Sequence, residues 1–87
     1  MTVAKIIESL TAKTESDEVQ WLRGIEQGNP CFQFTYKDSH FACQTDEPWL
    51  QIDGTKIDMS QAEDRRRVKM LAIAVHMQDI RRITGVS

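Results

Sequence analysis

The feature that most constrains the fold of this 87-residue chain is its last third, which has the pattern of one long helix from Ser60 to Thr84. Ser60 and Glu63 have the spacing of a capping box, in which each side chain hydrogen-bonds a free backbone amide of the first turn. Gly85 stands where a left-handed residue commonly ends a helix, and basic residues fill the last turn beside the negative end of the helix dipole. The pattern therefore predicts both ends of this helix.

Apolar residues lie on two opposite sides of the predicted helix, although a surface helix of a small domain needs only one apolar side. An 87-residue chain has little mass with which to bury a helix twice. We expect one stripe to pack on the protein's own sheet and the other on a second helix or a second chain; alternatively, the N-terminal helices cover both. The broader stripe contains Ala62, Met70, Ile73, Ala74, Met77 and Ile80, and the narrower stripe contains Val68, Leu71 and Val75.

The composition is that of one globular domain spanning residues 1–87. Hydrophobic residues make up 40% of the chain and charged residues 28%, which are ordinary values for a folded protein. No apolar run reaches the length of about 18 residues that a transmembrane helix needs, and the N-terminal residues lack the apolar segment and cleavage site of a signal peptide. We therefore expect a cytoplasmic protein with no membrane partner.

Charge is distributed unevenly along the chain. Residues 1–60 carry ten acids and five bases, a charge of −5, whereas residues 61–87 carry six bases and three acids, a charge of +3. An acidic body with a basic helix indicates either contact with nucleic acid or pairing between the two halves of the chain. Intramolecular pairing is the simpler interpretation.

Two helices are predicted in the first third of the chain. Apolar residues at the i, i+3, i+4, i+7 spacing predict an amphipathic helix from Thr2 to Lys13. A second helix is predicted at roughly 15–27, where acidic residues cluster at the expected N-terminus. A strand from Val19 to Ile25 is the competing prediction, because alternate residues there are apolar and a glycine weakens any helix.

After Pro30 the hydrophobic period changes to two, which predicts two β-hairpins. In the first hairpin, residues 38–39 form the predicted turn, which places Tyr36 opposite Phe41 and builds one aromatic face across both strands. In the second hairpin, residues 53–54 are an Asp-Gly pair, the dipeptide that favours a tight type I′ turn. Four antiparallel strands with one apolar face follow from these patterns.

The predicted architecture is a two-layer α+β domain. Two N-terminal helices precede a four-stranded antiparallel meander, and the long C-terminal helix packs on the aromatic face of the sheet. The other face of the sheet should be polar and solvated, with Trp49 on it beside an acidic loop, unless residues 46–48 turn the ring inward.

Catalytic and metal-binding patterns are lacking in the sequence. Cys31, His40, Cys43 and His76 do not have the spacings that hold zinc ligands in tetrahedral geometry. The two cysteines should lie on opposite faces of the sheet and remain reduced. Residues 38–40, Asp-Ser-His, look like ordinary turn composition because consecutive turn residues point in different directions. We therefore expect no enzyme activity, no cofactor and no metal.

This profile favours a small cytosolic protein-binding module, an inhibitor or adaptor of the kind that phages and mobile elements encode, which acts by stoichiometric binding to a protein partner. A half-exposed tryptophan among polar neighbours is typical of an interface anchor. The narrower helical stripe is a patch that a soluble monomer rarely exposes, so it also predicts a homodimer. The expected partner-binding residues are Val68, Leu71, Val75 and Trp49.

The alternative function is nucleic-acid binding through the basic C-terminal helix. Arginine suits phosphate, but three consecutive helical residues project about 100° apart and do not form a single basic face. The sequence pI of about 5.6 also disfavours a dedicated nucleic-acid binder. The residues expected to contact phosphate or an acidic surface are Arg65, Arg66, Arg67, Lys69, Arg81 and Arg82.

Overall fold

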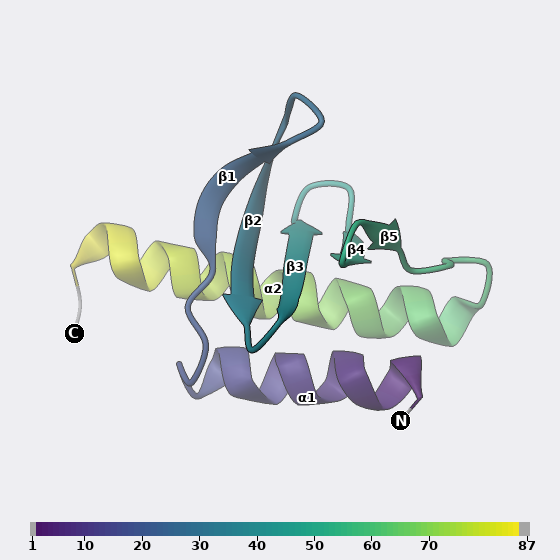
Figure 1. The fold of residues 1–87 in the computed structure, drawn as a ribbon. Coiled ribbons are helices and arrows are strands. Elements are labelled where there is room, and N and C mark those ends of the chain that lie inside the picture. The colour runs from purple at the N-terminus through teal and green to yellow at the C-terminus, as the bar shows by residue number, and fades with distance from the viewer. Residues whose placement is uncertain (1, 86–87) are drawn as a thin grey trace.

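The computed structural model describes residues 2–85 as a five-stranded antiparallel sheet with two helices. The elements are α1 (Val3–Glu15), β1 (Leu22–Glu26), β2 (Asn29–Tyr36), β3 (Ser39–Gln44), β4 (Trp49–Ile52), β5 (Thr55–Lys56) and α2 (Ala62–Thr84). The strands follow one another across the sheet in chain order, and both helices lie on one of its faces (Figure 1). The predicted α+β class, with a long C-terminal helix on an antiparallel sheet, is confirmed.

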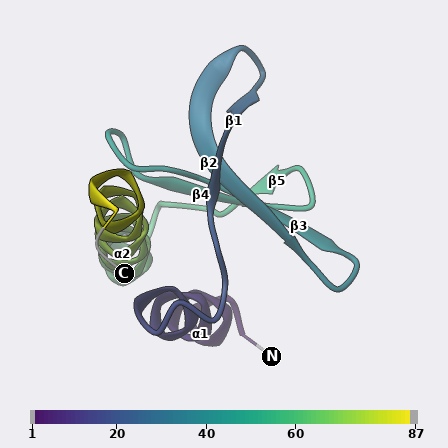
Figure 2. The same ribbon diagram turned by 90° about the vertical axis from the view of Figure 1, so that its left-hand side faces the viewer.

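The two helices lie side by side and run in the same direction, as Figures 1 and 2 show. Arg67 near the start of α2 contacts Glu8 of α1, and Gln78 near its end bonds the last turn of α1 at Thr14. Viewed along the helices, the sheet lies over both of them, and the β1–β2 hairpin projects away from the helical layer (Figure 2). The domain therefore has a helical layer with one free outer surface. No helix within residues 2–85 has both the length and the apolarity needed to cross a membrane.

The core lies between the inner face of the sheet and the helix pair. Phe34 pairs with Phe41 across β2 and β3, and their rings stack with centroids 5.0 Å apart. Trp21, just before β1, meets Phe34 edge to face at 4.4 Å. Ile7 of α1 and Leu50 of β4 are fully buried in the same cluster. The predicted aromatic inner face is therefore present and forms the roof of the core.

The predicted helix at roughly 15–27 is wrong, and the competing prediction of a strand is closer. Helix α1 continues to Glu15, and Asp17 then takes a left-handed conformation with φ 60°, which turns the chain toward the sheet. Residues 22–26 form β1, paired with β2, so the sheet has five strands and not the four expected. At Gly24 the end of the Gln33 side chain occupies the space that a β-carbon would need, so a larger residue here would require that side chain to move.

The two later hairpins differ in how well their predicted turns match the structure. The first turn is wrong by one residue: Tyr36 pairs with Ser39, and Phe34 faces Phe41. This shift changes each pairing by two positions, so every side chain keeps its predicted face. The second turn is confirmed, with Asp53 at φ 50° and Gly54 at φ 85°, as a type I′ turn requires.

The start of α2 also differs from the prediction, whereas its end agrees. The first helical residue is Ala62, its cap is Gln61, and no side chain caps the first turn, so the predicted capping box is wrong. Asp58 instead accepts hydrogen bonds from both the backbone and the hydroxyl of Ser60, which holds that residue outside the helix. Gly85 ends the helix in the left-handed conformation with φ 68°, as expected.

Candidate functional site

The two apolar stripes of α2 are oriented opposite to the prediction. Val68, Leu71 and Val75, which were expected to bind a partner, are each 0% exposed and lie in the core against the sheet. Because no solvent reaches these side chains, a partner cannot contact them while the domain is folded. In the broader stripe, the side chains that face outward are Met70, Ile73, Met77 and Ile80. They are among the most exposed large apolar side chains of the described chain.

Two polar residues explain why the narrower stripe is the buried one. Gln78 and Asp79 lie on the same side of α2 as Val75 and are themselves buried. Each has a fixed partner in the segment before or within β1, so the helix must present this side to the sheet. Burial of a polar side chain is tolerated where all its hydrogen bonds have partners. Those partners lie far away in the sequence, so the pattern of α2 alone does not reveal them.

The outward side of α2 carries a continuous apolar ridge, which we call the α2 seam: Met70, Ile73, Met77 and Ile80. Their exposed fractions are 55%, 56%, 48% and 39%. The spacing of three, four and three residues is the period at which one helix packs along another. Ile83, one turn further on, is also exposed. The seam is thus an apolar surface with regular helical spacing.

The seam is a ridge between two grooves. On the α1 side, a hollow of about 370 Å³ is lined by Thr11 and Glu15 of α1 and by seam residues. On the other side, a hollow of about 440 Å³ lies between α2 and the β3–β4 connection, with Pro48 and His76 in its wall. A ridge flanked by grooves matches the way in which helix surfaces interlock.

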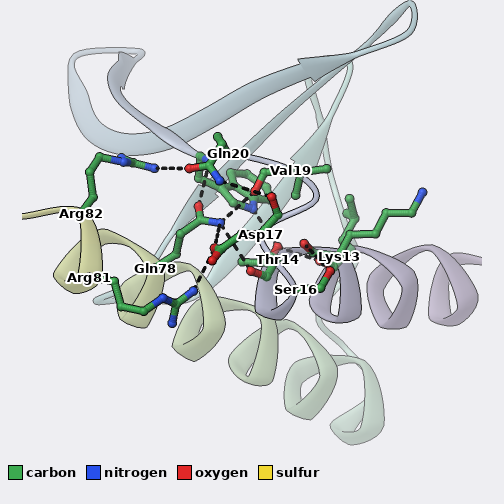
Figure 3. Close-up of polar contacts among 11 residues, drawn as sticks. Lys13, Thr14, Ser16, Asp17, Val19, Gln20, Gln78, Arg81 and Arg82 are labelled. Carbon is green, nitrogen blue, oxygen red and sulfur yellow. Dashed lines mark hydrogen bonds and ion pairs between the residues drawn. The ribbon is translucent and has the colours of Figure 1, made fainter. Parts of the chain in front are cut away.

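A polar cluster fastens the end of α2 to the segment that joins α1 to β1 (Figure 3). The Gln78 side-chain oxygen accepts from the Trp21 backbone amide at 2.9 Å. Its amide nitrogen donates to the Val19 carbonyl at 2.8 Å and to the Asp17 carboxylate at 3.1 Å. The Trp21 indole donates to Thr14 at 2.9 Å. This cluster fixes the rotation of α2 about its axis, and therefore fixes the seam on the outer surface.

Three of the six lysine and arginine residues of α2 pair with acids of the same chain. Arg67 contacts Glu8 of α1 as well as two acids in its own helix. Arg81 meets Asp17 at 2.9 Å, and Arg82 meets Asp79 at 3.7 Å. Arg65 instead donates to backbone carbonyls just before the helix. These contacts match the simpler interpretation of the charge pattern, in which the two halves pair with each other.

Arg66 and Lys69 differ from the other predicted phosphate-binding residues. Both are exposed, and within residues 2–85 neither has an ion pair with a carboxylate. Within the same residues Arg65 also lacks an ion pair, but backbone carbonyls hold its guanidinium. Arg66 lies four residues before Met70, which places it on the N-terminal continuation of the seam. These two cations are therefore the basic groups of α2 that an outside partner can neutralise.

Asp79 is the buried acid of the α2–β1 contact, and its titration should make stability depend on pH. Hydrogen bonding from Arg23, followed by the charges of Arg23 and Arg82, lowers the pKa of Asp79 below its ordinary value of 3.8. The lowered pKa means that this contribution to stability is complete above about pH 4 and is lost as the pH falls through the folded-state pKa. We expect the urea midpoint to fall between pH 4 and pH 2, and Asp79→Asn to reduce that slope. Asp46→Asn, which changes an exposed acid, should leave the slope nearly unchanged.

Trp49 lies on the outer face of the sheet, as predicted, with its ring half-buried beside polar groups. It lines a hollow of about 450 Å³ together with Glu26, Asp46 and Glu47. The Lys56 ammonium lies 4.9 Å from the centre of the Trp49 ring, so this ring face already holds a cation. The hollow is polar and acidic, and it faces away from the helices.

The cysteines have no geometry for redox or nucleophilic chemistry. Cys31 and Cys43 are both buried and both free. Burial raises the pKa of Cys43 to about 12 and also raises that of Cys31, so neither forms a thiolate readily near neutral pH. Among residues 2–85, no group of three acidic, cysteine or histidine side chains is placed to hold a metal ion.

Comparison with known proteins gave no family and no relative. No protein-family model matches the chain, and neither the curated proteins nor the solved structures gave a significant similarity. A function for this chain must therefore be argued from its own surfaces.

Proposed function

We propose that this chain is a protein-binding module, an adaptor or inhibitor that acts by stoichiometric association, and that its binding face is the α2 seam. The observation that carries the proposal is the row of four large apolar side chains left exposed along a helix that is otherwise well packed. Single exposed apolar residues are common on soluble proteins, but a continuous row with its own grooves is typical of a contact surface.

The composition of the seam supports a protein partner in preference to another ligand class. Methionine adapts its flexible side chain to different packing surfaces, and isoleucine adds rigid apolar area. The flanking grooves are open, and neither contains a cluster of buried polar groups of the kind that orients a small substrate. A partner helix would bury the ridge and fill both grooves.

Nucleic-acid binding remains the weaker alternative. Arg67, Arg81 and Arg82 would have to leave carboxylates of their own chain before they could contact phosphate. Arg66 and Lys69 alone offer two phosphate contacts, whereas tight binders neutralise several more. The apolar ridge that follows them along α2 also adds nothing to binding a phosphate backbone.

The proposal is tested by affinity capture from the cells that express the chain, with variants changed on different surfaces. The seam variant combines Ile73→Glu with Met77→Glu. The matched control combines Leu22→Glu with Ile25→Glu, which replaces two apolar residues on β1, each at least as exposed as the seam residues, by the same two charges. Proteins held by the wild type and by the control should be lost from the seam variant, because buried unpaired carboxylates oppose association.

Circular dichroism and thermal melting should show all three proteins equally folded, because each substituted side chain is largely in solvent. If the seam variant retains every protein that the wild type captures, the α2 seam is not the binding face and the proposal fails.

A further inference from the structure

We propose that the occupant of the α2 seam is the seam of a second copy, with the two α2 helices antiparallel about a two-fold axis. This inference rests on the proposed function, because it names the partner of the same surface. It replaces the homodimer expected through Val68, Leu71 and Val75, which are buried in the core.

The seam is complementary to itself only when the second helix runs the opposite way. With the two-fold axis midway between Ile73 and Met77, Met70 faces Ile80 of the partner subunit, and Ile73 faces Met77 of the partner subunit. Each of the four layers then contains one methionine and one isoleucine, so the layers have similar widths. Parallel pairing would instead give layers of two methionines alternating with layers of two isoleucines.

Charge at the N-terminal end of the seam disfavours the parallel arrangement. Arg66 occupies the next position of the seam pattern before Met70 and has no ion pair within the described residues. Parallel pairing would place Arg66 against its own copy. Antiparallel pairing places it beside Thr84 of the partner subunit, at the negative end of that helix dipole. The two arginines of that last turn are already paired with carboxylates of their own chain.

Ala74 allows the two helices to approach closely. It lies beside the seam on the α1 side, one position after Ile73, and it is buried by its own domain. Because Ala74 ends at a methyl group that its own domain already buries, no large side chain stands beside the seam there to hold a second helix away. The α1 helices then flank the pair on the same side, and the contact becomes a layer of four helices.

The exposed apolar area is sufficient for a weak dimer. The four seam residues and Ile83 are each between 39% and 63% exposed. This corresponds to roughly 500 Å² per copy, or about 1,000 Å² for two, near the lower limit for specific protein interfaces. The outer faces of both sheets, with their Trp49 hollows, would point away from this contact and stay accessible to other proteins.

Sedimentation equilibrium of the purified chain tests the dimer, and a pair of opposite charges tests its orientation. The wild type and the Leu22→Glu, Ile25→Glu control should both dimerise at micromolar concentrations. Ile73→Glu alone should raise the dissociation constant at least about 100-fold, because each copy buries an unpaired carboxylate. Met77→Lys alone should also weaken the dimer, by at least about tenfold.

An equimolar mixture of the Ile73→Glu and Met77→Lys chains should form a heterodimer within about tenfold of wild-type affinity. In the antiparallel arrangement, Glu at position 73 of one chain faces Lys at position 77 of the other, and the second layer of this kind keeps its wild-type isoleucine and methionine. Parallel pairing would not bring the two charges into one layer. A folded wild type that remains a single 10 kDa species up to high micromolar concentration overturns the inference. In that case, capture that still depends on the seam would leave the proposed function standing. Dimerisation of the wild type without rescue in the mixture overturns the antiparallel geometry.

Discussion

Leu71→Ala is expected to destabilise the domain by about 3 kcal/mol, because a fully buried leucine of a small core leaves a cavity when it is truncated. Leu71 is 0% exposed and belongs to the cluster formed by the sheet and both helices. A domain of this size has a free energy of unfolding of roughly 5–10 kcal/mol, so the loss is a large fraction of the total. Urea unfolding followed by tryptophan fluorescence measures it, since Trp21 lies in the same core.

The matched control for Leu71→Ala is Ile73→Ala, two residues away on the same helix. Ile73 is 56% exposed, so its truncation should change the free energy of unfolding by less than about 0.5 kcal/mol. If both substitutions cost the same, or if Ile73→Ala costs more, the rotation of α2 described here is wrong and the broader stripe faces the core.

Gln78→Ala is expected to cost about 2–3 kcal/mol, although the residue looks like an ordinary polar helix position. Truncation removes the acceptor of the buried Trp21 amide and the donor to the Val19 carbonyl, and an unsatisfied buried group costs about 1–3 kcal/mol. The same urea experiment measures the loss. Gln20→Ala, which truncates an exposed glutamine with weaker contacts in the same cluster, should cost less than about 1 kcal/mol.

An equal cost for the two glutamine substitutions would show that the cluster in Figure 3 does not hold α2 in place. The seam would then owe its exposure to apolar packing alone. Gln78→Ala should instead lower the free energy of unfolding more than Gln20→Ala does, while truncation of an exposed seam residue leaves it nearly unchanged. That result would show that a polar contact sets which side of α2 faces outward.

The parts of the fold that could be predicted from sequence are those governed by local pattern. The Asp53-Gly54 turn is confirmed because its dipeptide specifies its own backbone conformation. Gly85 ends α2 for the same kind of reason. The aromatic face of the sheet survived an incorrect turn, because a pairing shift of two positions leaves each residue on its face.

The parts that could not be predicted depend on contacts between distant residues. The segment 22–26 has weak helix and strand preferences of its own, and its pairing with β2 decides the outcome. The buried side of α2 was misassigned because apolar counting favours the broader stripe. Gln78 and Asp79 mark the true inner side, but only their partners in the segment before β1 and in β1 make that burial favourable.

The exposed side of α2 was misassigned for the same reason, whereas Trp49 lies on the sheet face that strand parity gives it and not on the inward side that the sequence left open. One signal in the sequence could have indicated the exposed side of α2: the strict spacing of Met70, Ile73, Met77 and Ile80, which the narrower stripe does not share over the same length. A core helix on a sheet does not need that regularity, whereas a helix that packs along another helix does.

The central claim, that the α2 seam is where another protein chain binds, is tested most directly by methionine methyl NMR. Met70 and Met77 lie on the seam, and Met59 lies partly buried at the edge of the core, so one labelled sample contains both the probes and a reference. The Met70 and Met77 methyl signals should shift with protein concentration or on addition of a captured partner, while Met59 stays constant. Association that leaves Met70 and Met77 unchanged would contradict the claim.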